Sequence, residues 1–179
     1  MTQTGTAFSK LIKRYTGNTY NHISLALDDD LAEMYSFGRR NAYLFFYGGF
    51  VIESPSRGTF KRFKHTIAKV LELSVSEQEF EKLIDVLGEF VMQRKRFHYN
   101  FRGLLKARKH IDYQKNQHCF YCSQFVKHLF EKTGIIAKNL LGEVVAPEDF
   151  ALIEGVTVVY EGLLREYRAP LLLPLGAIK

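Results

Sequence analysis

The sequence predicts an α+β fold, and three observations lead to that prediction. Segments in which apolar and polar residues alternate, a pattern typical of strands, dominate the N-terminal part of the chain. Two segments with apolar residues at helical spacing follow, and one more strand-like segment comes late in the chain. Because these elements are grouped rather than strictly alternating, we expect an antiparallel sheet with helices packed on it.

The strands are expected in the following places. Residues 21–27 show the clearest period of two, since Ile23, Leu25 and Leu27 alternate with smaller or polar residues. Residues 28–30, three aspartates, form a turn, and residues 31–38 return as the second strand of a hairpin. The other predicted strands are residues 43–53, which a Gly48-Gly49 pair interrupts, residues 66–73 and residues 156–160.

The helices are equally well marked. A short amphipathic helix is expected at residues 6–15. Ser76 and Glu79 form a capping-box pattern that opens a longer helix reaching about residue 94. A further helix covers residues 120–131, and Gly134 ends it. Residues 99–104 and 144–149 are expected to be loops.

Length and composition indicate an ordinary globular protein. The 179 residues, 46% of them hydrophobic, can bury a core without disulfides or a structural metal, so we expect one domain over residues 1–179. The formal net charge of +6 permits an acidic partner but requires none. No signal-peptide pattern and no long apolar run is visible, so the expected location is the cytoplasm.

The most informative local feature is a cysteine, Cys122, at the start of a predicted amphipathic helix. A helix N-terminus presents free N–H groups and a partial positive charge, which favour a thiolate and can hold the oxygen of a tetrahedral intermediate. The alternative interpretation is that Cys122 is a small buried hydrophobic residue.

A nucleophilic cysteine needs a base, and His22 is the best candidate among six histidines. It lies in a predicted strand, on the face opposite the large apolar residues, although it could equally be an ordinary edge histidine. The other histidines occur in basic or loop-like surroundings and are expected to be solvated. They are His65, His98, His110, His118 and His128.

A third group should orient the imidazole, and the returning hairpin strand is its natural source. Glu33 shares the face of His22 if the turn is a two-residue loop, whereas a one-residue slip places Ser36 opposite His22. The register of the hairpin cannot be read from the sequence, so both residues remain candidates.

These segments resemble the circularly permuted papain-like branch of the NlpC/P60 superfamily. The resemblance is carried by the strand Tyr20-Asn21-His22-Ile23-Ser24-Leu25-Ala26-Leu27, the strand Met34-Tyr35-Ser36-Phe37-Gly38-Arg39 and the helix start Phe120-Tyr121-Cys122-Ser123-Gln124-Phe125-Val126. Histidine precedes cysteine in this branch, which includes YiiX-like proteins and relatives of lecithin retinol acyltransferase, and the order is reversed in ordinary papain-like enzymes.

The resemblance implies an antiparallel sheet or partial barrel with the cysteine helix packed on it. It also implies a cysteine hydrolase or acyltransferase that cleaves an amide or ester bond through a thioester. Cys122 would be the nucleophile and His22 the base, with Tyr121 and Ser123 in the vicinity of the substrate and the oxyanion. Many relatives carry a Glu on the strand after the histidine, where this chain has Met34-Tyr35-Ser36, with Glu33 slightly earlier. This departure leaves open a weakened or inactive enzyme.

Two other features of the sequence are compatible with different functions. Cys119 and Cys122 form a C-x-x-C pattern, but the sequence offers neither a second pair of zinc ligands nor the strand that a redox motif requires, so no metal or organic cofactor is expected. A non-catalytic module that binds nucleic acid or anionic lipid is the alternative function, with nucleic acid the weaker case. It would use the basic segments at residues 61–64, 94–97 and 106–110.

The expected substrate is a small molecule, a peptide or an acyl lipid, and peripheral contact with a membrane is compatible with the apolar residues 171–178. The sequence does not select one of these classes, and it does not indicate an oligomeric state.

Overall fold

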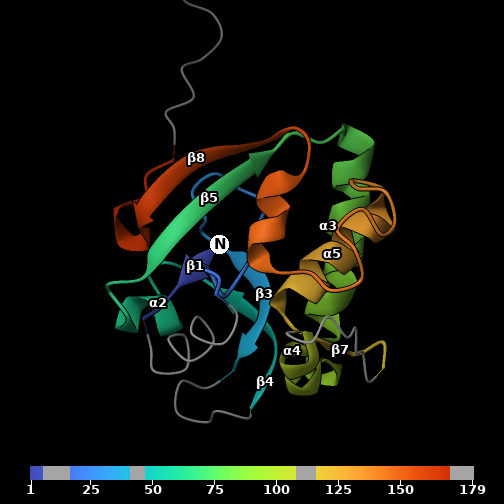
Figure 1. The fold of residues 1–179 in the computed structure, drawn as a ribbon, viewed down its shortest axis with the longest axis horizontal. Coiled ribbons are helices and arrows are strands. Elements are labelled where there is room, and N and C mark those ends of the chain that lie inside the picture. Colours follow the sequence, from blue (N-terminus) through green and yellow to red (C-terminus); the bar gives the residue numbers. More distant parts are fainter. Residues whose placement is uncertain (6–16, 41–46, 108–115, 170–179) are drawn as a thin grey trace, which may run out of the picture.

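A computed structural model describes residues 1–5, 17–40, 47–107 and 116–169 of the chain. It confirms a mixed α+β fold with antiparallel sheets (Figure 1). The helix predicted at residues 6–15, the first part of the strand predicted at residues 43–53 and the apolar residues 171–178 lie outside the described residues.

Two three-stranded antiparallel sheets form the framework. One has the order β1-β5-β8 and the other the order β2-β3-β4. The strands are β1 (Thr2–Gln3), β2 (Leu25–Ala26), β3 (Met34–Arg39), β4 (Gly48–Glu53), β5 (Ile67–Leu73) and β8 (Val156–Leu163). A small parallel pair, β6 (His98–Tyr99) and β7 (Cys119–Phe120), lies beside them.

The two sheets meet at one residue pair. Thr2 N donates to His22 O at 2.8 Å, and His22 N donates to Thr2 O at 3.2 Å. Thr2 is also paired with Ala68 of β5. Through this bridge the strands follow one another in the order β4-β3-β2-β1-β5-β8, and His22 lies near the middle of the combined sheet.

The helices α3 (Glu77–Met92) and α5 (Cys122–Thr133) lie side by side (Figure 1). The predicted capping box is present, because Glu79 N donates to Ser76 Oγ and Ser76 N donates to Glu79 Oε2. Gly134 ends α5 with φ 87°, a left-handed conformation that glycine adopts without strain. The shorter helical segments are α2 (Gly58–Arg62), α4 (Phe101–Ala107), η1 (Arg94–Arg96), η2 (Pro147–Leu152) and η3 (Leu164–Glu166).

Two of the predicted loops are wrong. Residues 99–104 contain the end of β6 and the start of α4, because Asn100 caps that helix: its Oδ1 accepts from Gly103 N at 2.9 Å. Residues 144–149 run into η2, where Asp149 Oδ2 accepts from Ala146 N at 2.7 Å. In both cases a side chain supplies a local hydrogen bond that hydrophobic periodicity does not reveal.

Aromatic rings join the sheets to the helices. Phe37 of β3 is fully buried, and its ring lies 5.1 to 6.2 Å from the rings of Phe50, Phe90, Phe97, Phe120 and Phe125. Such edge-on and tilted packing holds α5 firmly against β3 and β4. The N-terminal turn of α5 is therefore fixed relative to the strands.

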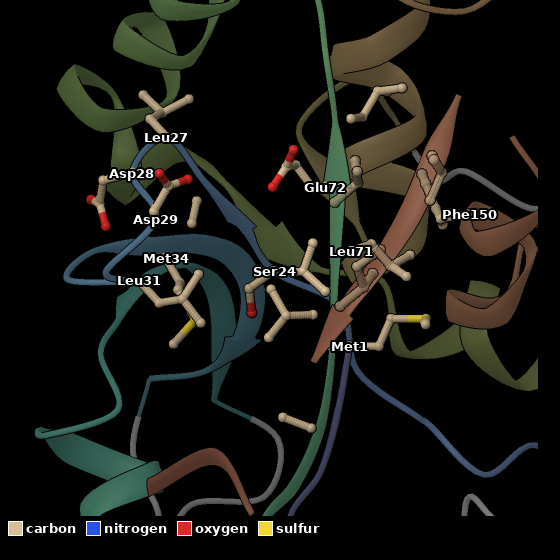
Figure 2. Close-up of a pocket in the computed structure, with 18 of the residues that line it drawn as sticks. Met1, Ser24, Leu27, Asp28, Asp29, Leu31, Met34, Leu71, Glu72 and Phe150 are labelled. Carbon is tan, nitrogen blue, oxygen red and sulfur yellow. The ribbon is translucent and has the colours of Figure 1, made fainter. Parts of the chain in front are cut away.

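A cavity of about 280 Å³ lies between β2 and β5 (Figure 2). Met1, the residue before β1, lines one end of it, and residues of both sheets and of α3 and α5 also line it. This volume is near the lower end of the range for ligand-binding pockets, about 300–1,000 Å³.

Candidate functional site

Cys122 is the first residue of α5, and it is 3% exposed. The turn before it is held in place by Gln124, whose Oε1 accepts from Tyr121 N at 3.2 Å and from Asn100 Nδ2 at 3.1 Å. The backbone N–H groups of Ile23 and Ser123 donate hydrogen bonds to the Cys122 sulfur. The thiol thus lies at the positive end of a rigidly anchored helix.

His22 faces this thiol from the other side of the sheet junction. A hydrogen bond links the His22 side chain to Cys122. The backbone of His22 is fixed by its bridge to Thr2. A base and a candidate nucleophile are therefore in contact, each on an element that tertiary packing holds rigid.

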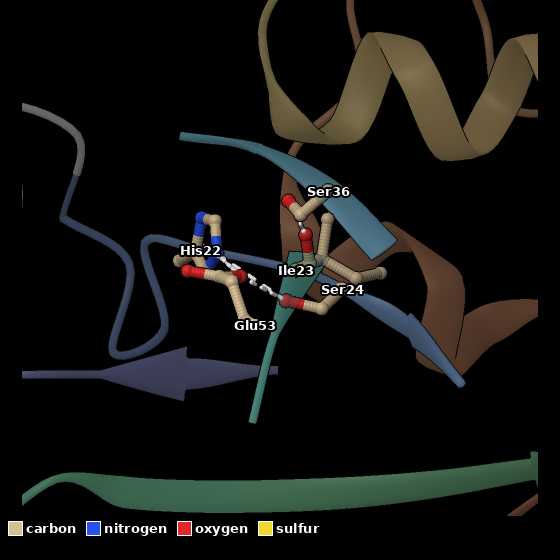
Figure 3. A network of polar contacts seen from close by, with 5 residues as sticks. All are labelled: His22, Ile23, Ser24, Ser36 and Glu53. Carbon is tan, nitrogen blue, oxygen red and sulfur yellow. Dashed lines mark hydrogen bonds and ion pairs between the residues drawn. The ribbon is translucent and has the colours of Figure 1, made fainter. Parts of the chain in front are cut away.

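Glu53, the last residue of β4, binds the second side of the imidazole. Its Oε2 lies 2.7 Å from His22 Nε2 and accepts a hydrogen bond from Ser24 Oγ at 2.8 Å (Figure 3). Because Nε2 is engaged with Glu53, Nδ1 is the ring nitrogen left for Cys122. Cysteine, histidine and glutamate thus form a linear chain of three groups.

Gly38 of β3 makes this arrangement possible. β3 lies between β2 and β4, so the side chains of His22 and Glu53 meet across it. A Cβ atom at Gly38 would lie 3.7 Å from His22 Cε1 and 3.8 Å from Glu53 Oε1. A side chain larger than a methyl group would occupy the space in which these two residues make contact.

The ionisation of the three groups follows from these contacts. Burial alone would lower the pKa of His22, but the Glu53 carboxylate and the hydrogen bonds to Cys122 and Glu53 outweigh it and raise that pKa to about 10. Burial alone would raise the pKa of Glu53, yet the charge and hydrogen bond of His22 and the hydrogen bond of Ser24 lower it overall. Glu53 is a carboxylate and His22 an imidazolium at neutral pH.

Burial also disfavours the thiolate, but it does not decide the state of Cys122. The hydrogen bond and charge of His22, followed by the N–H groups of Ile23 and Ser123, lower the Cys122 pKa below its ordinary value. The geometry therefore favours a thiolate–imidazolium pair that is stabilised by a carboxylate. Such a pair can attack a carbonyl carbon and protonate a leaving group.

The structure does not bring the two expected orienting residues to His22. Glu33 is exposed at the start of the hairpin strand, where it accepts from Tyr35 Oη at 3.1 Å and lies 3.8 Å from Arg57. Ser36 is fully buried, and its Oγ donates to Ile23 O at 2.7 Å. Ser36 therefore fixes the backbone next to His22, and Glu53, rather than Glu33 or Ser36, is the residue that contacts the imidazole.

The sequence pattern does not point to Glu53, because the register of the hairpin concerns only residues of its own two strands. Glu53 belongs to the next strand along the chain, which is two strands away from His22 in the sheet. One signal was present: Glu53 is the only charged residue of the aromatic-rich segment 43–53, and it stands at the end of that strand. A carboxylate in such a position needs a partner when it is buried.

The neighbours of Cys122 in sequence differ in their roles. Tyr121 and Ser123 are both buried, and Ser123 contributes its N–H to the Cys122 sulfur.

Tyr99 of β6 is a further neighbour of Cys122, and the sequence pattern does not point to it. Burial, followed by the negative charges of Cys122 and Tyr121, raises the Tyr99 pKa well above its ordinary value, so its phenol stays a neutral hydrogen-bond donor.

Among the described residues, the other histidines have no recorded contact with this site. His65 and His98 are exposed as expected, and His110 lies outside the described residues. His128 is not freely solvated: burial, and then Lys132, lower its pKa, and its ring packs on Phe90 and Phe120. His118 is partly buried and packs on Phe97, and its Nδ1 has no partner among the described residues.

The C-x-x-C cysteines and the basic segments, which suggested a metal site or a binding module, lie on different elements of the fold. Cys119 and Cys122 are both free thiols, and the described residues contain no group of three His, Cys, Asp or Glu side chains suited to a metal ion. Of the basic segments, Lys61 and Arg62 end α2, η1 consists of residues 94–96, and Lys106 lies near the end of α4. Within the described ranges, no helix is both long and apolar enough to cross a bilayer.

Comparison with protein families, with curated proteins and with solved structures gives no match to this chain.

Proposed function

We propose that this chain is a cysteine hydrolase of the permuted papain-like type, with Cys122 as nucleophile, His22 as base and acid, and Glu53 as the group that orients His22. The observation that carries this proposal is the linear contact from Cys122 through His22 to Glu53, with the thiol at a helix N-terminus. Its support is geometric and electrostatic: three buried groups whose pKa values are all shifted towards the reactive charge state.

In the first half of the proposed reaction, the Cys122 thiolate attacks the carbonyl carbon of an amide or ester. The resulting oxyanion is stabilised by backbone N–H groups at the start of α5. The carbon–nitrogen or carbon–oxygen bond then breaks, and the imidazolium of His22 gives its proton to the leaving amine or alcohol. The product of this step is a thioester on Cys122 and a neutral His22.

In the second half, neutral His22 removes a proton from a water molecule, which attacks the thioester. The carbon–sulfur bond breaks, the carboxylic acid product leaves, and the thiolate–imidazolium pair is restored. If an alcohol or amine replaces water, the same step becomes acyl transfer. Glu53 stays ionised throughout and holds Nδ1 of His22 towards Cys122.

The test is the pH dependence of alkylation by iodoacetamide, followed at Cys119 and Cys122 separately by mass spectrometry. An unpaired thiol titrates near 8.5. We expect Cys122 to react with an apparent pKa well below that value, and His22→Ala to raise the apparent pKa towards it. His128→Ala is the matched control, because His128 is on the same helix but packs on Phe90 and Phe120, and no contact of it with Cys122 is recorded. Ordinary titration of Cys122 in both the unmodified chain and His22→Ala would refute the proposal.

A further inference from the structure

One end of the molecule is rich in basic residues. Residues 90–107, which run from the end of α3 through η1 and β6 to the end of α4, contain five Lys or Arg residues and no Asp or Glu. In Figure 1 the lower ends of β3 and β4 lie beside α4, and Arg40 directly follows β3. We call this region the basic end. Its basic side chains are Arg40, Arg94, Lys95, Arg96, Arg102 and Lys106.

Close packing of β6 on β4 holds the parts of the basic end together. A Cβ atom at Gly48 would lie 2.8 Å from Tyr99 Cβ, and one at Gly49 would lie even closer to Phe97 O, so the strands approach each other through bare backbone. Arg40 donates to Phe97 O at 2.9 Å and to a carbonyl group of η1. Because η1 precedes β6 and α4 follows it, both helical segments are fixed beside the β3–β4 pair.

Most basic side chains at this end are exposed. Arg102 and Lys106 lie one turn apart on the exposed face of α4, and all three residues of η1 are exposed. Among the described residues, no ion pair is recorded for Arg94, Lys95 or Arg102. Positive charge therefore accumulates here with little compensation from nearby acids.

The charge of the molecule is unevenly distributed along α3. This helix begins at the upper end of the molecule in Figure 1, where Glu77 and Glu79 occupy its first turn, and it runs down to the basic end. An anionic surface would attract the lower end and repel the start of α3. The field of the protein thus favours a single orientation on such a surface.

Exposed apolar side chains lie among the basic ones. Met92 is 80% exposed and Leu105 is 60% exposed, the first just before η1 and the second beside Lys106 on α4. Tyr47 is also exposed, and the Arg40 guanidinium lies 5.8 Å from the centre of its ring.

These apolar side chains favour a membrane over a nucleic acid. Basic side chains alone suit the phosphates of either partner. Single-stranded nucleic acid is bound through aromatic rings on which the bases stack, and aliphatic side chains such as Met92 and Leu105 give no such platform. Aliphatic side chains flanked by Lys and Arg are typical of surfaces that enter the interface of a bilayer.

We propose that the basic end docks the protein on an anionic membrane, with its Lys and Arg side chains at the lipid headgroups and with Met92 and Leu105 at the boundary of the acyl chains. Each basic residue near such a membrane strengthens binding about fivefold. The two apolar side chains add a contribution that charge alone does not supply. This surface does not depend on the chemistry of Cys122, so it goes beyond the proposed hydrolase function.

Co-sedimentation of the full-length chain with lipid vesicles tests the proposal. The vesicles contain phosphatidylcholine alone or phosphatidylcholine with about 30% phosphatidylserine, in about 0.1 M salt. We expect binding to the vesicles with phosphatidylserine to be tighter by about tenfold or more. Equal binding to the two kinds of vesicle, or binding to neither, would overturn the proposal.

A pair of charge variants separates this surface from the net charge of the chain. Lys95→Gln with Arg102→Gln should weaken binding to the vesicles with phosphatidylserine about twentyfold. Lys82→Gln with Lys138→Gln is the matched control, because it removes the same charge from two exposed positions outside the basic end. An equal loss in both double variants would show that net charge alone drives binding, which would refute the assignment.

Met92→Ser with Leu105→Ser separates a membrane from a nucleic acid. We expect this variant to bind the same vesicles about three- to tenfold more weakly, because it loses apolar contact with the bilayer. Unchanged binding would overturn the proposal. Tight binding of a fluorescein-labelled single-stranded RNA, followed by anisotropy, would then assign the basic end to nucleic acid.

The alkylation profile of Cys122 keeps docking and catalysis apart. Each variant at the basic end should retain the circular dichroism spectrum and the Cys122 profile of the unmodified chain. If Cys122 titrates as an ordinary thiol while the vesicles bind as expected, the hydrolase function fails and the docking surface stands. If Cys122 is activated but the vesicles do not bind, the docking surface fails and the hydrolase function stands.

Discussion

Strand β7 and the first turn of α5 each carry a cysteine, and the two differ in chemistry rather than in exposure. Cys119 is 6% exposed and Cys122 is 3% exposed, and both are free. Only Cys122 contacts a histidine and accepts N–H groups at a helix N-terminus. Because the two thiols are similarly buried, burial does not distinguish them, and the hydrogen-bond partners of Cys122 are what lowers its pKa.

Replacing each cysteine by serine should have the largest effect on activity and should affect only one of the two positions. Cys122→Ser should lower kcat for an amide or ester substrate by about a thousandfold or more, because the nucleophile is lost. Cys119→Ser should keep kcat within about twofold. Thermal unfolding of both variants is the control that separates chemistry from folding, and an active Cys122→Ser variant would show that the nucleophile lies elsewhere.

Glu53→Gln should remove most of the difference in alkylation between Cys122 and Cys119. Without the carboxylate, the His22 pKa falls from about 10 towards its ordinary value, and the thiolate of Cys122 loses its cationic partner. The Cys122 pKa therefore rises, so the acid limb of the alkylation profile should move to higher pH. We expect kcat/KM at pH 7 to fall about tenfold to a hundredfold. Glu33→Gln is the matched control, and an equal loss there would contradict the assignment of Glu53.

Two substitutions of increasing size at Gly38 should show whether the contact between His22 and Glu53 needs the room that this glycine leaves. Gly38→Ala adds one methyl group at ordinary contact distances to His22 and Glu53, although 3.3 Å from the Val51 side chain, and should preserve most activity. Gly38→Val fills the space between the two side chains and should raise the apparent pKa of Cys122 much as Glu53→Gln does. The measurement is the iodoacetamide profile, and a Gly38→Val profile identical to that of the unmodified chain would be the contrary outcome.

The alkaline side of the pH profile should distinguish turnover from alkylation. The raised pKa means that His22 keeps its proton until the pH approaches about 10 and loses it above that value. Turnover needs that proton for the leaving group, so kcat should decline as the pH passes about 10. Alkylation needs only the thiolate and should not decline there. A parallel decline in both would indicate unfolding, which circular dichroism at the same pH values detects.

Ser24→Ala should have the smallest effect. It removes one of the two hydrogen bonds that Glu53 Oε2 accepts, while the contact with His22 remains. A hydrogen bond to a charged group contributes about 1.5–3 kcal/mol, and solvent can replace part of it because Ser24 is only partly buried. We expect a two- to tenfold loss in kcat/KM. A loss as large as that of Glu53→Gln would mean that Ser24 itself holds His22.

Local patterns in the sequence predict much of this fold. The capping box of α3, the glycine end of α5, strand β5 and the position of Cys122 at a helix start depend on neighbouring residues, and each agrees with the structure. Glu53 could not be found in this way. Its contact with His22 requires the pairing of three strands and the absence of a side chain at Gly38, and neither follows from the hairpin alone. The cavity lies between strands of two separate sheets, whose packing no local pattern encodes.

The bridge between Thr2 and His22 also has a consequence for the order of folding. His22 meets Glu53 across 31 residues of sequence, and it meets Thr2 and Cys122 only through contacts between distant segments. Loops of such length close late, because their entropy cost precedes the contacts that compensate it. The proposed activation of Cys122 therefore requires that the sheet junction and α5 have both assembled, and the rate of Cys122 alkylation during refolding would report that assembly.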